Sequence, residues 1–166
     1  MPRKIRNFFV IPVVMLIILA SCDSKQVFDA YQSVPKKWHK DSLMTFTVTA
    51  PDTISTYNLF VNLRNNSDYA YSNLFLIAEL QYPNGKTIKD TLEYKMAAPN
   101  GELLGEGFTD VKENKLWYKG YDSPFVFGES GDYTITLQQA MRRNGDVNGV
   151  LELEGITDIG FRIEHK

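Results

Sequence analysis

The sequence predicts an antiparallel β-sandwich, of the jelly-roll or immunoglobulin-like type, over residues 42–166. Three observations favour this all-β class. Apolar and polar residues alternate with a period of two in several segments, these segments recur roughly every 8 to 15 residues, and no amphipathic helical run of useful length separates them. The chain has 166 residues, of which 43% are hydrophobic, and this suffices for one domain with a well-filled core.

The amino-terminal segment, residues 1–21, has the pattern of a lipoprotein signal peptide. Three basic residues between positions 3 and 6 precede an apolar run over 8–20. As a helix this run would cover about 20 Å, less than the roughly 30 Å of a bilayer's hydrocarbon core, so a permanent membrane span is the weaker interpretation. The run ends in LASC at 19–22, which resembles the bacterial lipobox Leu-(Ala/Ser/Thr)-(Gly/Ala/Ser)-Cys.

The lipobox resemblance predicts cleavage between Ser21 and Cys22 and acylation of Cys22, which becomes the first residue of the mature chain. The lipid membrane is then one partner, because each buried methylene of an acyl chain contributes about 0.8 kcal/mol and two or three chains hold a protein on a bilayer. Removal of residues 1–21 leaves 15 basic and 20 acidic side chains, a net charge of −5. The alternative is an ordinary signal peptide with an incidental Cys.

Residues 22–41 are predicted to form a tether. Polar residues are mixed here with a few aromatic ones, and no clean period is visible. Such a segment would let the folded part stand off the bilayer.

The first predicted strands lie between residues 43 and 94. Residues 56–64 alternate as a half-buried strand does, with Phe60 as the exception on the polar face. Residues 74–82 begin apolar on both faces, as in a central strand. The YPNG sequence at 82–85 predicts a tight turn into a strand over 86–94, which completes a hairpin.

Shorter strands are predicted in the second half of the chain. They lie at 115–118, 131–141, 147–153 and 159–163. PNG at 99–101 and NG at 144–145 predict turns. About eight strands result, and their number and spacing are typical of a sandwich.

Composition and motifs argue against several classes of function. The near balance of 18 basic and 20 acidic residues gives no basic face for nucleic acid. One Cys and two His leave no thiolate zinc site and little material for another metal centre. No nucleophile elbow, phosphate-binding loop or EF-hand loop is present. We therefore expect no catalytic residues, no metal and no cofactor.

One pair of carboxylates permits an enzymatic alternative. Glu152 and Glu154 would share one face of a strand, about 7 Å apart, which is within the range for a glycosidase acid and base. We prefer the interpretation that they are a solvent-facing pair on an edge strand.

Four residues are candidates for binding a partner: Arg64, Trp117, Tyr118 and Arg142. Arginine and aromatic residues dominate the energetics of protein interfaces. The competing interpretation is core packing for the aromatic residues and pairing with a local carboxylate for the arginines. Exposed aromatic residues, Trp38 and Tyr121 included, could also form a platform for a glycan.

The mature chain as a whole resembles the gliding-motility lipoprotein GldH family. The resemblance covers nearly all of it and depends on the order and spacing of its segments. These are SCD at 21–23, YNLFVNLRN at 57–65, SNLFL at 72–76, DTLEY at 90–94, KENKLWY at 112–118, QAMR at 139–142, GI at 155–156, Gly160 and RI at 162–163.

The resemblance implies a non-catalytic lipoprotein of the bacterial cell envelope that supports gliding motility and is linked to type IX protein secretion. Its expected partners are other gliding or secretion lipoproteins and envelope proteins. The family contributes no catalytic residues, and only Cys22 carries over, as the lipidation site. An outer-membrane location with the domain on the periplasmic side is favoured. A carbohydrate-binding lipoprotein or weak glycan hydrolase, and a purely structural envelope lipoprotein, are the alternatives.

Overall fold

Ten β-strands form the regular structure of the protein, which is described by a computed structural model over residues 23–107 and 109–166. The predicted signal peptide, Ser21 and Cys22 lie outside these described residues. None of the described segments is a helix, and so none is a helix able to span a bilayer. The all-β prediction is confirmed.

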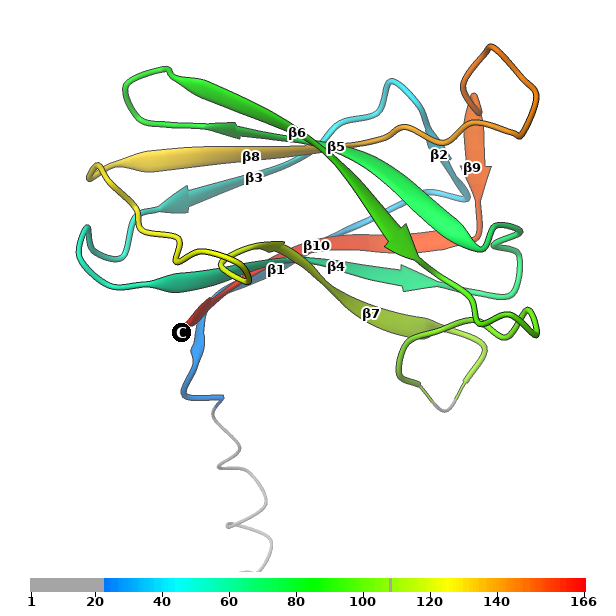
Figure 1. Cartoon of the computed structure of the whole chain (residues 1–166), viewed down its shortest axis with the longest axis horizontal. Coiled ribbons are helices and arrows are strands. Elements are labelled where there is room, and N and C mark those ends of the chain that lie inside the picture. Colours follow the sequence, from blue (N-terminus) through cyan, green and yellow to red (C-terminus); the bar gives the residue numbers. More distant parts are fainter. Residues whose placement is uncertain (1–22, 108) are drawn as a thin grey trace, which may run out of the picture.

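Two four-stranded sheets stack as the layers of a sandwich (Figure 1). The first sheet has the order β1-β10-β4-β7 and the second has the order β3-β8-β5-β6, and every pairing is antiparallel. Strands β2 and β9 pair separately at one end. The bounds are β1 Gln26–Ser33, β2 Lys37–His39, β3 Met44–Thr49, β4 Tyr57–Asn65, β5 Asn73–Gln81, β6 Thr87–Lys95, β7 Lys112–Lys119, β8 Asp132–Gln139, β9 Glu152–Glu154 and β10 Ile156–His165.

The strand order is that of a jelly roll. Among the eight strands of the two sheets, the first pairs with the last, the second pairs with the seventh, and the fourth pairs with both the fifth and the seventh. A chain folded back on itself in this way crosses between the sheets at almost every connection. Of the two sandwich types predicted from the sequence, the jelly roll matches the observed order.

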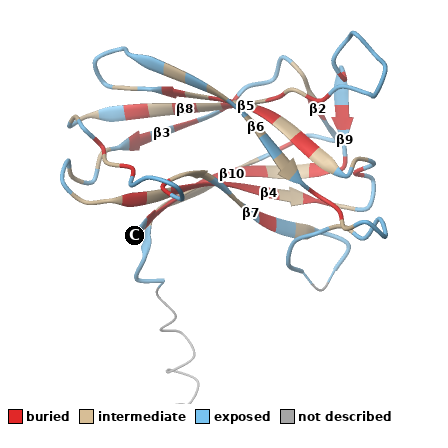
Figure 2. Ribbon diagram, in the orientation of Figure 1, coloured by how far each residue is buried: buried red, intermediate tan, exposed pale blue. Residues whose placement is uncertain are grey.

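The core lies between the two sheets, and buried residues alternate with more exposed ones most clearly along β3, β5 and β8 (Figure 2). On β5, for example, Leu74, Leu76, Ala78 and Leu80 are fully buried. Trp38 of β2 pairs with Leu153 of β9, and both are fully buried where they close one end of the core. Trp38 is therefore a core residue, as the core-packing interpretation expects.

The edges of the two sheets are joined by side-chain hydrogen bonds. On one side Gln32 of β1 donates to the carbonyl of Thr45 on β3. On the other side the hydroxyl of Tyr94 on β6 donates to the carbonyl of Trp117 on β7, at 2.7 Å. Tyr118 and Lys119 of β7 both donate to the carboxylate of Asp90 on β6, at 3.0 and 2.8 Å.

The tether prediction is wrong for the described part of residues 22–41. Gln26–Ser33 forms β1, which pairs with β10 along its length, and Lys37–His39 forms β2. The sequence of β1 shows no simple alternation because most of its residues are only partly buried on both faces. The folded domain therefore begins near residue 26, and not at residue 42. The strand predicted at 147–153 is also shorter, and it lies at Glu152–Glu154.

The predicted turns are present. Gly85 has φ +86° and its N–H donates to the carbonyl of Tyr82, which closes the β5–β6 hairpin. Gly101 donates to Ala98 in the same manner, and Gly145 has φ +86° within the loop before β9. The strand over 86–94 corresponds to β6.

Gly155 joins β9 to β10 in a position that no other residue type fits. It has φ +81°, and its Cα lies against the backbone of Asp68 and Tyr69 in the β4–β5 connection. A Cβ atom there would overlap that backbone.

We expect Gly155→Ala to lower the free energy of unfolding by about 3 kcal/mol, because left-handed strain is added to steric overlap with backbone that cannot move aside. Gly85→Ala is the matched control, since Gly85 has φ +86° but open space around it. It should lose about 1 kcal/mol from backbone strain alone. Urea unfolding followed by tryptophan fluorescence measures both values. Equal losses in the two variants would show that packing at Gly155 contributes nothing.

Candidate functional site

The outer face of the β1-β10-β4-β7 sheet carries most of the charged and aromatic side chains that the fold brings together. Within the part of the chain that the structure describes, no further layer covers this face, and alternation along the four strands points every second side chain outward. The strand registers arrange these residues in three rows. From β1 to β7 the rows are Asp29–Arg162–Phe60–Trp117, Tyr31–Gly160–Asn62–Lys115 and Ser33–Asp158–Arg64–Glu113.

Tyr31 reaches across the sheet from its edge strand. Its hydroxyl donates to Glu113 on β7 at 2.8 Å, and the guanidinium of Arg64 lies 4.3 Å from the centre of its ring. Gly160 allows the Tyr31 side chain to cross β10, because a Cβ atom at position 160 would lie 2.8 Å from the Tyr31 ring. Arg64 also donates to Glu113 at 2.9 Å. Burial opposes the charge on Glu113, but the hydrogen bonds from Tyr31 and Arg64 outweigh it and lower the pKa of this carboxyl.

Arg162 is the centre of a second cluster on the same face. Its guanidinium donates to Asp29 and to Glu164, each at 2.6 Å, and to Asp23, the first described residue. Its side chain is only 13% exposed. Burial disfavours the charge on Arg162, but the bonds to Glu164 and Asp29 outweigh it and raise the pKa of Arg162 further above its usual range.

Glu164 is held between two cations. Lys115 donates to it at 2.7 Å and Arg162 donates at 2.6 Å. Burial acts to raise the pKa of Glu164, but these two hydrogen bonds and the charges of Lys115 and Arg162 lower it below its ordinary value of 4.5. Glu164 therefore stays ionised over the neutral range.

An aromatic patch, consisting of Phe60, Trp117 and Tyr121, lies beside these charges. The ring centres of Phe60 and Trp117 are 4.4 Å apart and those of Trp117 and Tyr121 are 5.3 Å apart. The ammonium of Lys115 lies 4.2 Å from the Phe60 ring centre. Phe60 is only 3% exposed, whereas Trp117 is 41% and Tyr121 is 71% exposed. The rings of Trp117 and Tyr121 are thus exposed to solvent, and they lie beside side chains that are packed and ion-paired.

Two of the four predicted partner-binding residues lie on this face. Arg64 and Trp117 point outward from β4 and β7, and the local pairing expected of Arg64 is confirmed by Glu113. The core-packing interpretation is wrong for Trp117, which is exposed and lies outside the core. Tyr118 points the other way, because neighbouring strand residues face opposite sides. Its ring packs toward the core and its hydroxyl bonds Asp90, so it takes no part in the aromatic patch.

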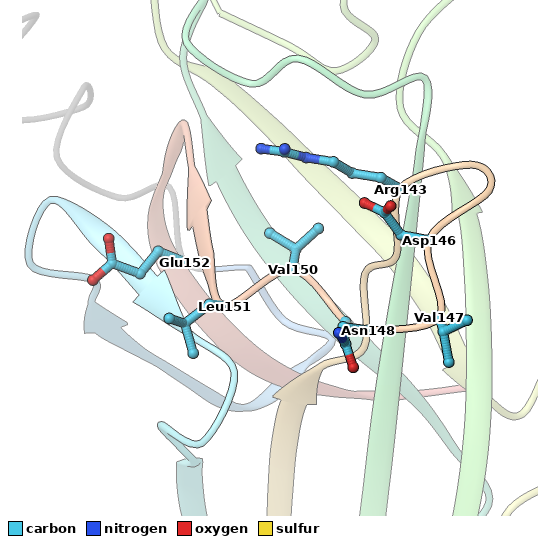
Figure 3. A pocket seen from close by; sticks show the side chains of 8 residues that line it. Arg143, Asp146, Val147, Asn148, Val150, Leu151 and Glu152 are labelled. Atoms are coloured by element: carbon cyan, nitrogen blue, oxygen red, sulfur yellow. The ribbon is translucent and has the colours of Figure 1, made fainter.

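Arg142 is remote from the outer face of the first sheet. It follows β8 and forms a bridge with Gly149, next to a pocket of about 370 Å³ that its neighbour Arg143 helps to line. Figure 3 shows that the lining side chains, Arg143 and Asp146 of the loop after β8 and Glu152 of β9 among them, do not converge on a common point. Across residues 23–107 and 109–166, no group of three or more metal-ligating side chains is arranged to hold a metal ion.

Glu152 and Glu154 lie exposed on β9, as the non-catalytic interpretation expects. Lys37 contacts both carboxylates, at 3.6 and 2.7 Å. The hydrogen bond from Lys37 lowers the pKa of Glu154. A glycosidase acid needs a raised pKa, so this arrangement disfavours the hydrolase alternative.

Sequence reasoning did not single out Tyr31, Glu113, Arg162 or Glu164. One signal was available for the residues of β10. The alternation of Ile159, Phe161 and Ile163 assigns Arg162 and Glu164 to the opposite face, beside the polar face of the strand over 56–64. No comparable signal exists for Tyr31, because the sequence around it shows no clean period.

We expect Glu164→Gln to lower the free energy of unfolding at pH 7 by about 2 kcal/mol, since Arg162 and Lys115 lose a shared anion. The pKa of Glu164 is lowered on folding, so its stabilisation is complete above pH 4.5 and is lost as the pH falls through the lowered value. The difference in the free energy of unfolding between wild type and variant should therefore decrease below pH 4.5, as measured by urea titrations.

Glu79→Gln serves as the control, because Glu79 pairs with Lys89 at 3.0 Å on an open surface. Its effect should stay below about 0.5 kcal/mol. If the difference in the free energy of unfolding between wild type and Glu164→Gln does not change with pH, the stabilising role assigned to the charge of Glu164 is contradicted.

Comparison with known proteins agrees with this architecture. The GldH lipoprotein family profile matches residues 26–163, from the start of β1 almost to the end of β10. The gliding motility lipoprotein GldH homolog of Christiangramia forsetii is 59% identical over 149 residues, 90% of each chain. The gliding motility lipoprotein GldH of Flavobacterium johnsoniae is 54% identical over 150 residues, 90% of this chain and 91% of that protein.

Among solved structures, a chain of infectious bursal disease virus Gt strain aligns with 85% of this protein at 13% identity and a TM-score of 0.35. This protein spans 32% of that viral chain, and the likeness carries no argument. The family match covers most of the chain, and both relatives share more than half of their aligned residues with it. The chain therefore belongs to the GldH lipoprotein family.

Proposed function

We propose that this lipoprotein supports gliding motility as a non-catalytic assembly or stabilising component linked to the type IX secretion apparatus. Cys22 carries the lipid, and the domain lies on the periplasmic side of the outer membrane. The names of its relatives in Christiangramia forsetii and Flavobacterium johnsoniae support the motility role. The lipobox at 19–22 supports the anchor.

The observation that carries the proposal is the aromatic patch. Trp117 projects from β7, and Tyr121 lies against it from the connection that follows this strand. The Arg162 and Glu113 clusters hold the neighbouring side chains in place, so little side-chain freedom is lost when a partner covers the patch. Exposed aromatic residues ringed by charged ones are typical of protein-binding hot spots. We assign the contact with another envelope protein to this patch.

The open edges of the two sheets are weaker candidates for that contact. Gln32 joins β1 to β3, and Asp90 and Tyr94 join β6 to β7. Lysines at 112, 115 and 119 lie along β7, and charged side chains on an edge strand discourage the addition of another strand. A partner is therefore expected on the outer face of the first sheet.

A glycan is the second candidate ligand, and the neighbouring rings of Trp117 and Tyr121 favour it. Their planes are inclined by 59°, so they offer two separate stacking surfaces and no continuous platform. Binding of isolated envelope glycans that disappears in Trp117→Ala would support this alternative over a protein partner.

We expect Trp117→Ala to reduce the recovery of envelope protein partners about tenfold, since loss of a central aromatic contact commonly costs 1.4 kcal/mol or more of binding free energy. The measurement is affinity purification of the full acylated chain from detergent-solubilised membranes, with quantification of motility and secretion components. Gliding of the same cells should decrease in parallel.

Leu151→Ala is the matched control, because Leu151 is also an exposed apolar residue but lies in the loop before β9. It should leave both recovery and gliding unchanged. Equal recovery from the wild type and from a folded Trp117→Ala variant would exclude the aromatic patch as the contact.

A further inference from the structure

The described chain begins at a point that is fixed to the folded domain. Asp23 forms an ion pair with Arg162, accepts a hydrogen bond from the N–H of Lys25 and, through its carbonyl, accepts another from Gln26. Cys22 is the residue directly before Asp23 in the sequence, and one peptide bond joins the two. A lipid on Cys22 would therefore be attached one residue before the ion pair of Asp23 with Arg162. No linker would separate the acyl chains from the domain.

The same end of the sandwich gathers several chain segments. The N–H of His165 donates to Lys25, that of Lys166 donates to Thr56, and the ammonium of Lys166 donates to the carbonyl of Gly120. Lys25 directly precedes β1, and His165 of β10 pairs with Tyr57 of β4, so these residues lie at adjacent ends of three neighbouring strands. About 10 Å separates the first of these strands from the third. Figure 1 places the start of the described chain and the C-terminus together at the lower left.

Two large apolar side chains are exposed at this end. Ile54 lies two residues before Thr56 and is 86% exposed, and Tyr121 follows Gly120 and is 71% exposed. Lys25 and Lys166 are exposed beside them. Two carboxylates lie near: Asp122 is exposed, whereas Asp52 accepts hydrogen bonds from Tyr57, Ile54 and Ser55. An apolar residue, an aromatic ring and lysines in one place are the side chains that favour a membrane interface.

We infer that this end, defined by Lys25, Ile54, Tyr121 and Lys166 and here called the anchor end, rests on the bilayer that holds the lipid of Cys22. The inference depends on the proposed acylation of Cys22. The short connection between Cys22 and the domain identifies the bilayer as the surface that the anchor end contacts. Residues within roughly 10 Å of a membrane-bound Cys22 lie at the depth of the lipid headgroups. Ile54 enters the interface, whereas Tyr121 lies at its polar boundary beside the lysines, where a partner on the aromatic patch can still contact it.

The opposite end of the sandwich then faces away from the bilayer. The loop from Met141 to Val150 projects there, at the upper right of Figure 1, and carries Val147, which is 85% exposed. Ile54 and Val147 are thus β-branched residues of nearly equal exposure at opposite ends of the domain.

A depth measurement tests this orientation. Cys22 is the only Cys in the chain, so in the acylated protein a Cys introduced at Ile54, Tyr121 or Val147 is the only reactive thiol. Each full-length acylated variant is labelled with a nitrobenzoxadiazole fluorophore and reconstituted into phosphatidylethanolamine–phosphatidylglycerol vesicles with a lipid-borne nitroxide quencher. We expect about threefold quenching for Ile54→Cys and Tyr121→Cys, and almost none for Val147→Cys.

Weak quenching at all three positions, or quenching as strong at Val147 as at Ile54, overturns the orientation while leaving the lipid anchor intact. Absence of the lipid on Cys22 would be recognised by a separate measurement. If Cys22 is not acylated, the wild-type chain reacts with a maleimide and does not float with the vesicles, and both proposals fall together.

Discussion

The antiparallel pairing of β1 with β10 is the interaction on which the other features of this protein depend. It adds the fourth strand to the first sheet, and it sets Asp29 opposite Arg162 and Tyr31 opposite Gly160. The two clusters on the outer face follow from this register. A shift by one residue would turn Tyr31 and Asp29 toward the core and leave the guanidinium of Arg162 without two of its carboxylate partners.

The clusters explain how the outer face of the first sheet buries side chains of its own. Phe60 and Asn62 are almost fully buried although no further layer of the described chain covers them. Lys115 and Trp117 lie against the Phe60 ring, and Lys115 is the neighbour of Asn62 on β7. Long basic side chains cover apolar surface with their stems and keep their charged groups with carboxylates or water. The aromatic patch and the anchor end share Tyr121, so a partner bound to the patch would lie near the membrane surface.

The sequence predicted the sandwich, its hairpin turns and most strands of the core, since alternation and turn chemistry are local signals. It also identified Arg64 and Trp117, and it marked Phe60 as the residue that breaks the alternation of its strand. It could not predict β1, whose residues are half-buried on both faces and so have no clear period. Strand alternation separates Trp117 from Tyr118, but which of the two faces the core is decided by the register of β7 on β4, a pairing between distant segments.

The first and last strands of the described chain are partners, and this has a consequence for how the protein is made. Ser33 and Asp158, which share a hydrogen bond, are 125 residues apart, and Asp23 and Arg162 are 139 apart. Contacts of such long range form late and slowly, because a long loop must close before they stabilise anything. During synthesis β1 emerges before the other strands and has no partner until β10 is made. The domain can therefore complete its fold only after nearly the entire described chain has been synthesised, and until then its first strand lacks the strand that it pairs with.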